Sequence, residues 1–159
     1  MVIKGDNKYM AIWQVSFHII SKSKKDVVDR IIEDNMDKII LWEDNISSLK
    51  SLDKISELLP LEKSWSSSII QYGSLEESCI KILLISDSSF ELSCRIDIRS
   101  LSKECAENII EFIKDNKAVI LYNEKYYDPT MNNLKEILLN SKAHKFCSDS
   151  ERFLKDLKQ

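Results

Sequence analysis

Glycine is nearly absent from this chain, which holds Gly5 and Gly73 as its two glycines among 159 residues. The phosphate-binding GxGxxG and Walker A loops need two or more glycines at close, fixed spacing, so both motifs are excluded. Histidine is equally scarce, and neither His18 nor His144 lies beside a GxSxG elbow or another nucleophile signature. These absences argue against the common nucleotide-binding and hydrolase classes and favour a protein without a catalytic centre.

Cysteines and apolar runs exclude further classes. The four cysteines show no CxxC or other metal-ligand spacing; they are Cys79, Cys94, Cys105 and Cys147. No apolar run approaches the ~20 residues of a membrane span, and the N-terminus lacks the apolar region of a signal peptide. We therefore expect a reduced cytoplasmic protein with no metal, no cofactor and no membrane contact.

The charge of the chain is small overall and unevenly placed. A net charge of −3 argues against general nucleic-acid binding, which depends on neutralising phosphates. Residues 1–25 carry five lysines against one aspartate, whereas residues 26–62 carry ten acids against four bases. The acidic segment includes Glu33, Asp34 and Asp37, and it fits either a surface that steers a basic partner or a solvated helical face.

The clearest structural pattern lies in residues 79–99, which read CIKILLISDSSFELSCRIDIR. Apolar and polar residues alternate strictly along its second half, which predicts a strand with one buried and one polar face. The first half is more continuously apolar, as is typical of a central strand covered on both sides. Short polar side chains at 87–89 favour a tight reversal between the halves, so the pattern predicts an antiparallel hairpin.

The polar face of the second strand carries Glu91, Arg95, Asp97 and Arg99. Two interpretations of this face compete. It is a solvated face with weak cross-strand ion pairs, or it is a recognition surface, because the planar arginine fork grips carboxylates and phosphates with two hydrogen bonds.

Hydrophobic periodicity predicts the remaining elements. Strands are expected at 9–20, 69–73, 118–122 and 125–127, and helices at 26–36, at 48–59, after a Ser102 N-cap, after Asp128-Pro129 and at 148–157. Apart from the short strand suggested at 69–73, the pattern of residues 39–42 and 61–78 does not distinguish strand, helix and loop. Trp65 lies in the second of these segments, beside a serine run, and is either a cap over the core or an exposed anchor for a partner.

The order of these elements predicts a single α+β domain over residues 1–159. Its antiparallel sheet is expected to carry helices mainly on one face. An elaborated ferredoxin-like core is one specific version of this arrangement.

A non-catalytic binding protein that acts through surface complementarity is the first functional hypothesis. The chain resembles the immunity proteins of bacterial toxin systems in three features: the acidic 26–62 segment, the Trp65 loop and the strand that ends with RIDIR at residues 95–99. The resemblance implies a compact acidic α+β domain that binds and blocks a cognate toxin. A basic protein partner is therefore expected.

Two alternatives come from other functional classes. The first is an enzyme or small-ligand binder with a pocket above the sheet, which requires polar residues such as His18, Arg95 or Asp97 to converge in a cavity. The second is a regulatory or structural homo-oligomer that pairs through the edge at Tyr126-Tyr127.

Overall fold

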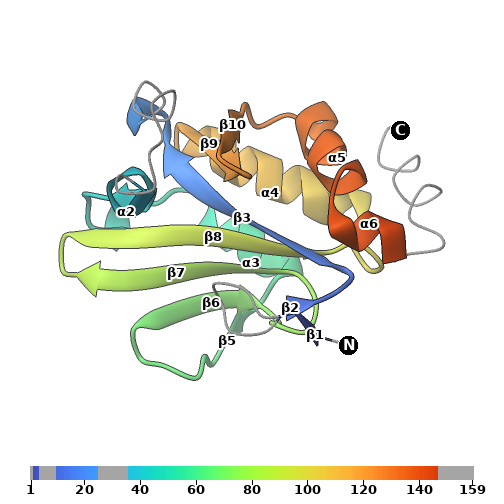
Figure 1. Cartoon of the computed structure of the whole chain (residues 1–159). Helices are drawn as coiled ribbons and strands as arrows, with labels where there is room; N and C mark the ends of the chain where they lie inside the picture. The colour runs from blue at the N-terminus through green and yellow to red at the C-terminus, as the bar shows by residue number, and fades with distance from the viewer. Residues whose placement is uncertain (1, 4–9, 25–35, 147–159) are drawn as a thin grey trace.

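An eight-stranded antiparallel sheet forms the centre of the computed structural model, which describes residues 2–3, 10–24 and 36–146 (Figure 1). The path of the sheet runs β10-β9-β3-β8-β7-β6-β5, and β4 pairs with β8 beside this path. The strands of the sheet are β3 (Gln14–Ser21), β4 (Leu41–Trp42), β5 (Leu61–Glu62), β6 (Ile69–Gly73), β7 (Cys79–Ser86), β8 (Ser89–Asp97), β9 (Ala118–Tyr122) and β10 (Lys125–Tyr127). A separate short ribbon pairs β1 (Val2–Ile3) with β2 (Met10–Ala11).

Four of the strands lie side by side in the order β9-β3-β8-β7. If these four are renumbered 1 to 4 along the chain, their order across the sheet is 4-1-3-2. This is the strand order of a ferredoxin-like sheet, in which a helix follows the first strand and another follows the third. Here α3 (Leu52–Leu58) precedes β7, and α4 (Lys103–Asp115) joins β8 to β9. The prediction of an α+β fold with an antiparallel sheet is confirmed, and the strand order agrees with its ferredoxin-like version.

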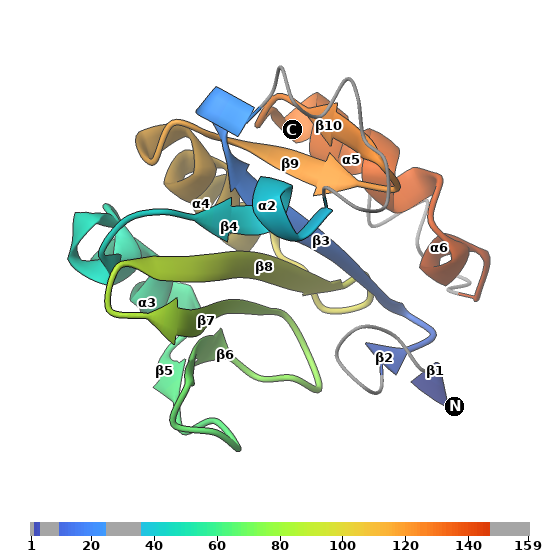
Figure 2. The same ribbon diagram turned by 60° about the vertical axis from the view of Figure 1, so that its left-hand side comes forward.

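Helices cover the two faces of the sheet unequally. The helices α3, α4, α5 (Met131–Leu139) and α6 (Lys142–Phe146) supply buried residues to the larger hydrophobic cluster on one face. The short helix α2 (Met36–Ile40) lies on the other face, where its Ile39 and Ile40 pack with residues of β3 and β9. Figure 2 shows α2 in front of the sheet with α3 and α4 behind it. We call the α2 side the open face.

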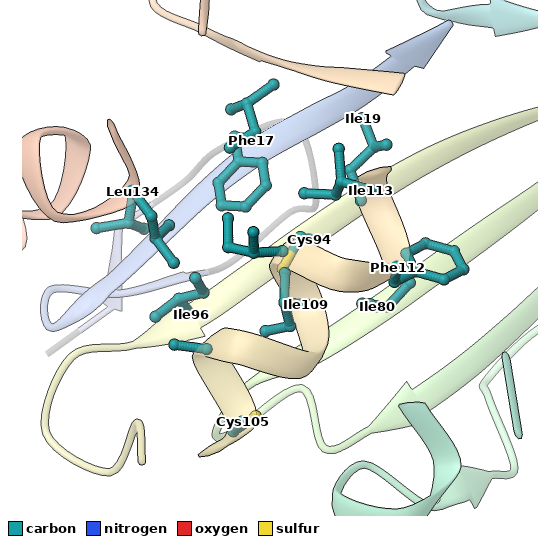
Figure 3. Packing of buried hydrophobic residues seen from close by; sticks show 14 of the residues in the cluster. Phe17, Ile19, Ile80, Cys94, Ile96, Cys105, Ile109, Phe112, Ile113 and Leu134 are labelled. Atoms are coloured by element: carbon teal, nitrogen blue, oxygen red, sulfur yellow. The ribbon is translucent and has the colours of Figure 1, made fainter. Parts of the chain in front are cut away.

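The main core forms where α4 crosses β3 and β8 (Figure 3). Alternate residues of β3 and β8 point toward this helix because side chains on a strand alternate between its faces. Phe17 and Cys94 represent the two strands, and Ile109 and Phe112 represent the helix; all four are at most 2% exposed. Ser102 caps the helix, since its Oγ accepts a hydrogen bond from the Cys105 N–H at 3.0 Å.

The predicted β7-β8 hairpin is confirmed, with one irregularity in its register. Near the turn, Ser86 is opposite Ser89, but beyond a bulge between Leu84 and Ser86 the pairing shifts by one residue. Lys81 consequently pairs with Ser93 and shares the open face with it. A bulge inserts one extra residue on one strand, so it changes which side chains meet on a face.

Several predicted boundaries are corrected. The strand predicted at 9–20 is two strands, because the chain turns at Ile12 and Trp13. The ambiguous residues 39–42 divide between the end of α2 and β4. Helix α5 is capped by Thr130, whose Oγ1 accepts from the Asn133 N–H, rather than by Asp128.

Other predictions concern the chain's helices and Gly73. The predicted 48–59 helix is shorter than expected, since η3 (Ile46–Ser48) precedes α3. Gly73, at the end of the predicted 69–73 strand, has a positive φ of +92°. Helix α6 was not predicted, and the helices predicted at 26–36 and 148–157 lie almost entirely outside the described residues.

Candidate functional site: a cationic pocket on the open face

A pocket of about 640 Å³ lies on the open face of the sheet. Strands β3, β7 and β8 supply most of its polar lining, and α2 contributes residues from the side. The polar residues that the strands contribute are Ser16, His18, Lys81, Glu91, Ser93 and Arg95. These residues meet because each lies on the parity opposite to the core-facing residues of its strand.

The strand register places these residues in a grid. Ser16 is opposite Arg95 across β3 and β8, and His18 is opposite Ser93. Lys81 is opposite Ser93 on the other side of β8, so it lies one diagonal step from Arg95. Diagonal neighbours on one face are about 7–8 Å apart at their backbones, within reach of long side chains. The register therefore places Lys81 beside Ser93, within reach of Arg95.

Arg95 is the most unusual residue of the pocket because it is buried with most of its hydrogen-bonding capacity unused. Its side chain is 3% exposed, and its Nη1 donates to the Leu75 carbonyl oxygen at 3.0 Å. Its Nε and Nη2 are buried without a hydrogen-bond partner. Burial lowers the pKa of the guanidinium, an effect that the nearby Cys79 opposes. Buried donors without partners cost about 1–3 kcal/mol each, so this arrangement needs an explanation.

Lys81 adds a second cation beside Arg95. It is 8% exposed, and burial, together with the positive charge of Arg95, lowers its pKa to about 8. Among the residues that the structure describes, no carboxylate forms an ion pair with Lys81 or Arg95. Two buried cations without a counter-charge form a region of positive potential, which an anion would neutralise.

Asp97 does not belong to the pocket, and its predicted place on an exposed polar face is wrong. It is 1% exposed, and its backbone N–H donates to Ser78 Oγ at 2.9 Å. Its carboxylate accepts from the Arg99 backbone N–H at 2.9 Å and from the guanidinium at 3.3 Å. The Arg99 guanidinium also lies 3.7 Å from the centre of the Trp13 ring. Asp97 and Arg99 thus fix the corner where β8 ends. Because Arg95 and Asp97 are both buried, the interpretation as a solvated face is wrong at these two residues.

The remaining predicted residues are dispersed. Trp65 is 72% exposed in the loop between β5 and β6, so the interpretation as a cap over the core is wrong. The interpretation as an exposed anchor for a partner stays a prediction. Asp37 is exposed on α2 and lines the pocket. Glu33 and Asp34 lie outside the described residues. The structure therefore brings Arg95 and Asp37 to one pocket and leaves Trp65 elsewhere.

Lys81 is the pocket residue that the sequence reasoning missed. A charged residue in the middle of the apolar run at 79–85 was the available signal, because a buried lysine is rare unless it has a role. Cys79, Cys94 and Cys105 are buried free thiols, and Cys147 lies outside the described residues. Tyr126 and Tyr127 are half-buried and pack against the two hydrophobic clusters.

The described part of the chain holds neither a metal-ligand cluster nor a membrane-spanning helix. Its histidines, cysteines and acids include no group of three or more that is placed to hold a metal ion. None of its helices has the length and apolar character needed to cross a membrane. Comparisons with protein-family models, curated proteins and solved structures found no match of any of the three kinds.

Proposed function

We propose that this protein binds a small anionic molecule in the open-face pocket. The observation that carries the proposal is Arg95, which is buried, lines the pocket and has two donor nitrogens without partners. Two oxygens of a carboxylate or phosphate would satisfy both donors, because their spacing matches the guanidinium fork.

Lys81 strengthens the case for an anion. Burial, and after it the positive charge of Arg95, lowers the pKa of this lysine to about 8. A bound anion would restore the usual protonation of this lysine and offset the repulsion between the cations. Charge-assisted hydrogen bonds are about twice as strong as neutral ones, so the site favours an anion over a neutral ligand.

The pocket is also large enough for a ligand with more than one functional group. Its volume of about 640 Å³ lies within the range of small-molecule sites, which is roughly 300–1,000 Å³. Apolar side chains such as Met36, Ile40 and Leu83 line it together with the polar ones. This mixture of polar and apolar side chains supports binding of an organic anion. The free cysteines of the described residues support a place in the reducing cytoplasm.

Calorimetric titration with acetate, glutarate and inorganic phosphate at constant ionic strength tests the proposal. We expect at least one of these anions to bind, and Arg95→Met or Lys81→Met to weaken that binding at least tenfold. Lys114→Met, which removes an exposed lysine from α4, is the matched control and should leave binding unchanged. Equal binding by the wild type and Arg95→Met, or no binding of these or of any other carboxylate tested, would overturn the proposal.

A second candidate is the protein-binding function expected from the sequence, and the exposed side chains near the β5 edge favour it. Trp65 is 72% exposed and Leu61 is 63% exposed. Tryptophan is among the residues most often found at the centres of protein interfaces. The candidate is supported if the wild type captures a single protein partner and Trp65→Ala abolishes this capture. Ile85→Ala, at another exposed apolar residue, is the control and should preserve it. Capture unaffected by Trp65→Ala would count against it.

A further inference from the structure

The open-face pocket has an acidic end as well as a cationic end. Glu91 precedes Arg95 by four residues on β8, and both side chains line the pocket. Strands rise about 3.3 Å per residue, which separates the two backbones by roughly 13 Å. Opposite charges therefore lie at the two ends of the wall that β8 forms, and a further acid, the exposed Glu124, lines the pocket from the turn between β9 and β10.

The acidic end holds two carboxylates without a counter-charge. Glu91 is half-buried, and Asp37 extends from α2 to the same pocket. Burial raises the pKa of Glu91, and the negative charge of Asp37 raises it further. No ion pair joins either acid to a cation within the described residues. Lys81 is a diagonal neighbour of Glu91 across β7 and β8, yet these two side chains are not paired with each other.

The stretch between the two ends is suited to a polar chain. Ser93 lies midway between Glu91 and Arg95 on the same face of β8, and His18 lies opposite it on β3. Hydroxyl and imidazole groups both donate and accept hydrogen bonds, as peptide groups do. Leu83, opposite Glu91 on β7, adds an apolar contact.

We propose that the anion is one end of a zwitterion about 10 Å long, such as a short peptide with free termini. Its carboxylate binds Arg95 and Lys81, and its ammonium group lies between Glu91 and Asp37. Three extended residues span at most about 10 Å, and the side chains at both ends cover the remaining distance. The inference rests on the proposed anion site, whose buried and unpartnered arginine is the independent sign of a ligand in this pocket.

The charge arrangement distinguishes this ligand from a simple anion. A dianion of the same length would place its second negative group against Glu91 and Asp37, where like charges repel. An ammonium group at that place would neutralise the two carboxylates. The same reasoning predicts that a ligand without a positive end forfeits the favourable interaction at the acidic end.

Three peptides form a matched set of probes for calorimetric titration of the full chain. Triglycine has both charged ends, N-acetyl-triglycine lacks the ammonium group and triglycine amide lacks the carboxylate. We expect triglycine to bind most tightly, and each blocked peptide to bind at least tenfold more weakly. Glu91→Gln should reduce the advantage of triglycine over its acetylated form, whereas Glu111→Gln, at an exposed acid of α4, should preserve it.

The outcomes separate the zwitterion from the anion site itself. Equal affinity for triglycine and N-acetyl-triglycine, with binding of both lost in Arg95→Met, would overturn the zwitterion and leave the anion site standing. Binding of acetate or phosphate without measurable binding of triglycine would overturn the zwitterion in the same way. Absence of binding by every peptide and every simple anion would overturn both.

Discussion

Replacing Arg95 with methionine should stabilise the ligand-free protein. The change removes a charge and two unpartnered donors from a side chain that is 3% exposed, and it keeps an unbranched apolar chain in the same place. Each unpartnered buried donor costs about 1–3 kcal/mol, so their removal recovers about 4 kcal/mol. The lost Nη1 bond to the Leu75 oxygen subtracts about 2 kcal/mol. That carbonyl still accepts from Gln14 Nε2 at 3.0 Å, so it keeps a partner.

The expected net gain is about 2 kcal/mol, which agrees with the ~1–4 kcal/mol found when buried ionic groups are replaced by apolar ones. For a domain of this size it corresponds to a rise in Tm of about 4–8 °C. Thermal unfolding followed by circular dichroism, in a buffer without carboxylates or phosphates, measures the change. Urea unfolding at 25 °C provides an independent value of the free energy of unfolding.

Arg99→Met is the matched control, because Arg99 lies on the same chain segment but its guanidinium is paired with a carboxylate. Its guanidinium bonds to the buried Asp97 carboxylate and lies over Trp13. Removing it leaves that carboxylate with fewer donors, so the Tm should fall. A fall in Tm for Arg95→Met as well would show that the Arg95 guanidinium is satisfied in the folded protein. The argument for an anion site would then lose its basis.

Three further predictions concern the fold and its response to pH. Gly73→Ala should destabilise the protein by more than about 1 kcal/mol in urea unfolding, because φ is +92° and a Cβ would overlap the Ser78 carbonyl oxygen. Lys81 has a folded-state pKa of about 8, below the ordinary 10.5, so the folded state binds fewer protons between these values. The stability conferred by Lys81, relative to Lys81→Met, should therefore rise by up to roughly 3 kcal/mol from pH 8 to pH 10.5. Ser102→Ala should cost about 0.5–2 kcal/mol, because the bond to the Cys105 N–H caps α4.

A specific result would contradict each of these three predictions. Ser74→Ala, beside Gly73, should have little effect; equal costs at both positions would contradict the role of φ. Flat or falling relative stability across pH 8–10.5 would contradict the lowered pKa of Lys81. Ser100→Ala is the control for the helix cap, since Ser100 is exposed and lies outside α4; an equal loss there would show that capping is not the cause.

Local pattern was sufficient for the elements whose residues carry a clear period or cap. The alternation from Phe90 to Ile98 predicted β8, and Ser102 predicted the start of α4. Such features act within a few residues, so no knowledge of distant contacts is needed. The start of α5 was misplaced because Asp128 and Thr130 are both good N-cap residues, and local pattern does not decide between them.

The candidate site was only partly predictable. Arg95 was identified, but its burial was not, because alternation gives a residue's face and says nothing about what covers that face. Its coverage depends on other parts of the fold, including the Leu75 backbone, which lies 20 residues away in sequence and accepts its hydrogen bond. Asp97 shows the same effect, since a polar residue on the open face became a buried structural partner of Arg99.

The sequence by itself determined the alternating faces of β8, the α+β class and the absence of glycine-rich phosphate loops. The tertiary structure alone decided the meeting of Lys81 with Arg95. A regular hairpin closed at Ser86 and Ser89 would place Lys81 opposite Cys94, on the core side. The bulge between Leu84 and Ser86 shifts the pairing by one residue and turns Lys81 to the open face. A one-residue shift reverses every side chain of a strand, and it depends on how the whole sheet packs rather than on any local pattern.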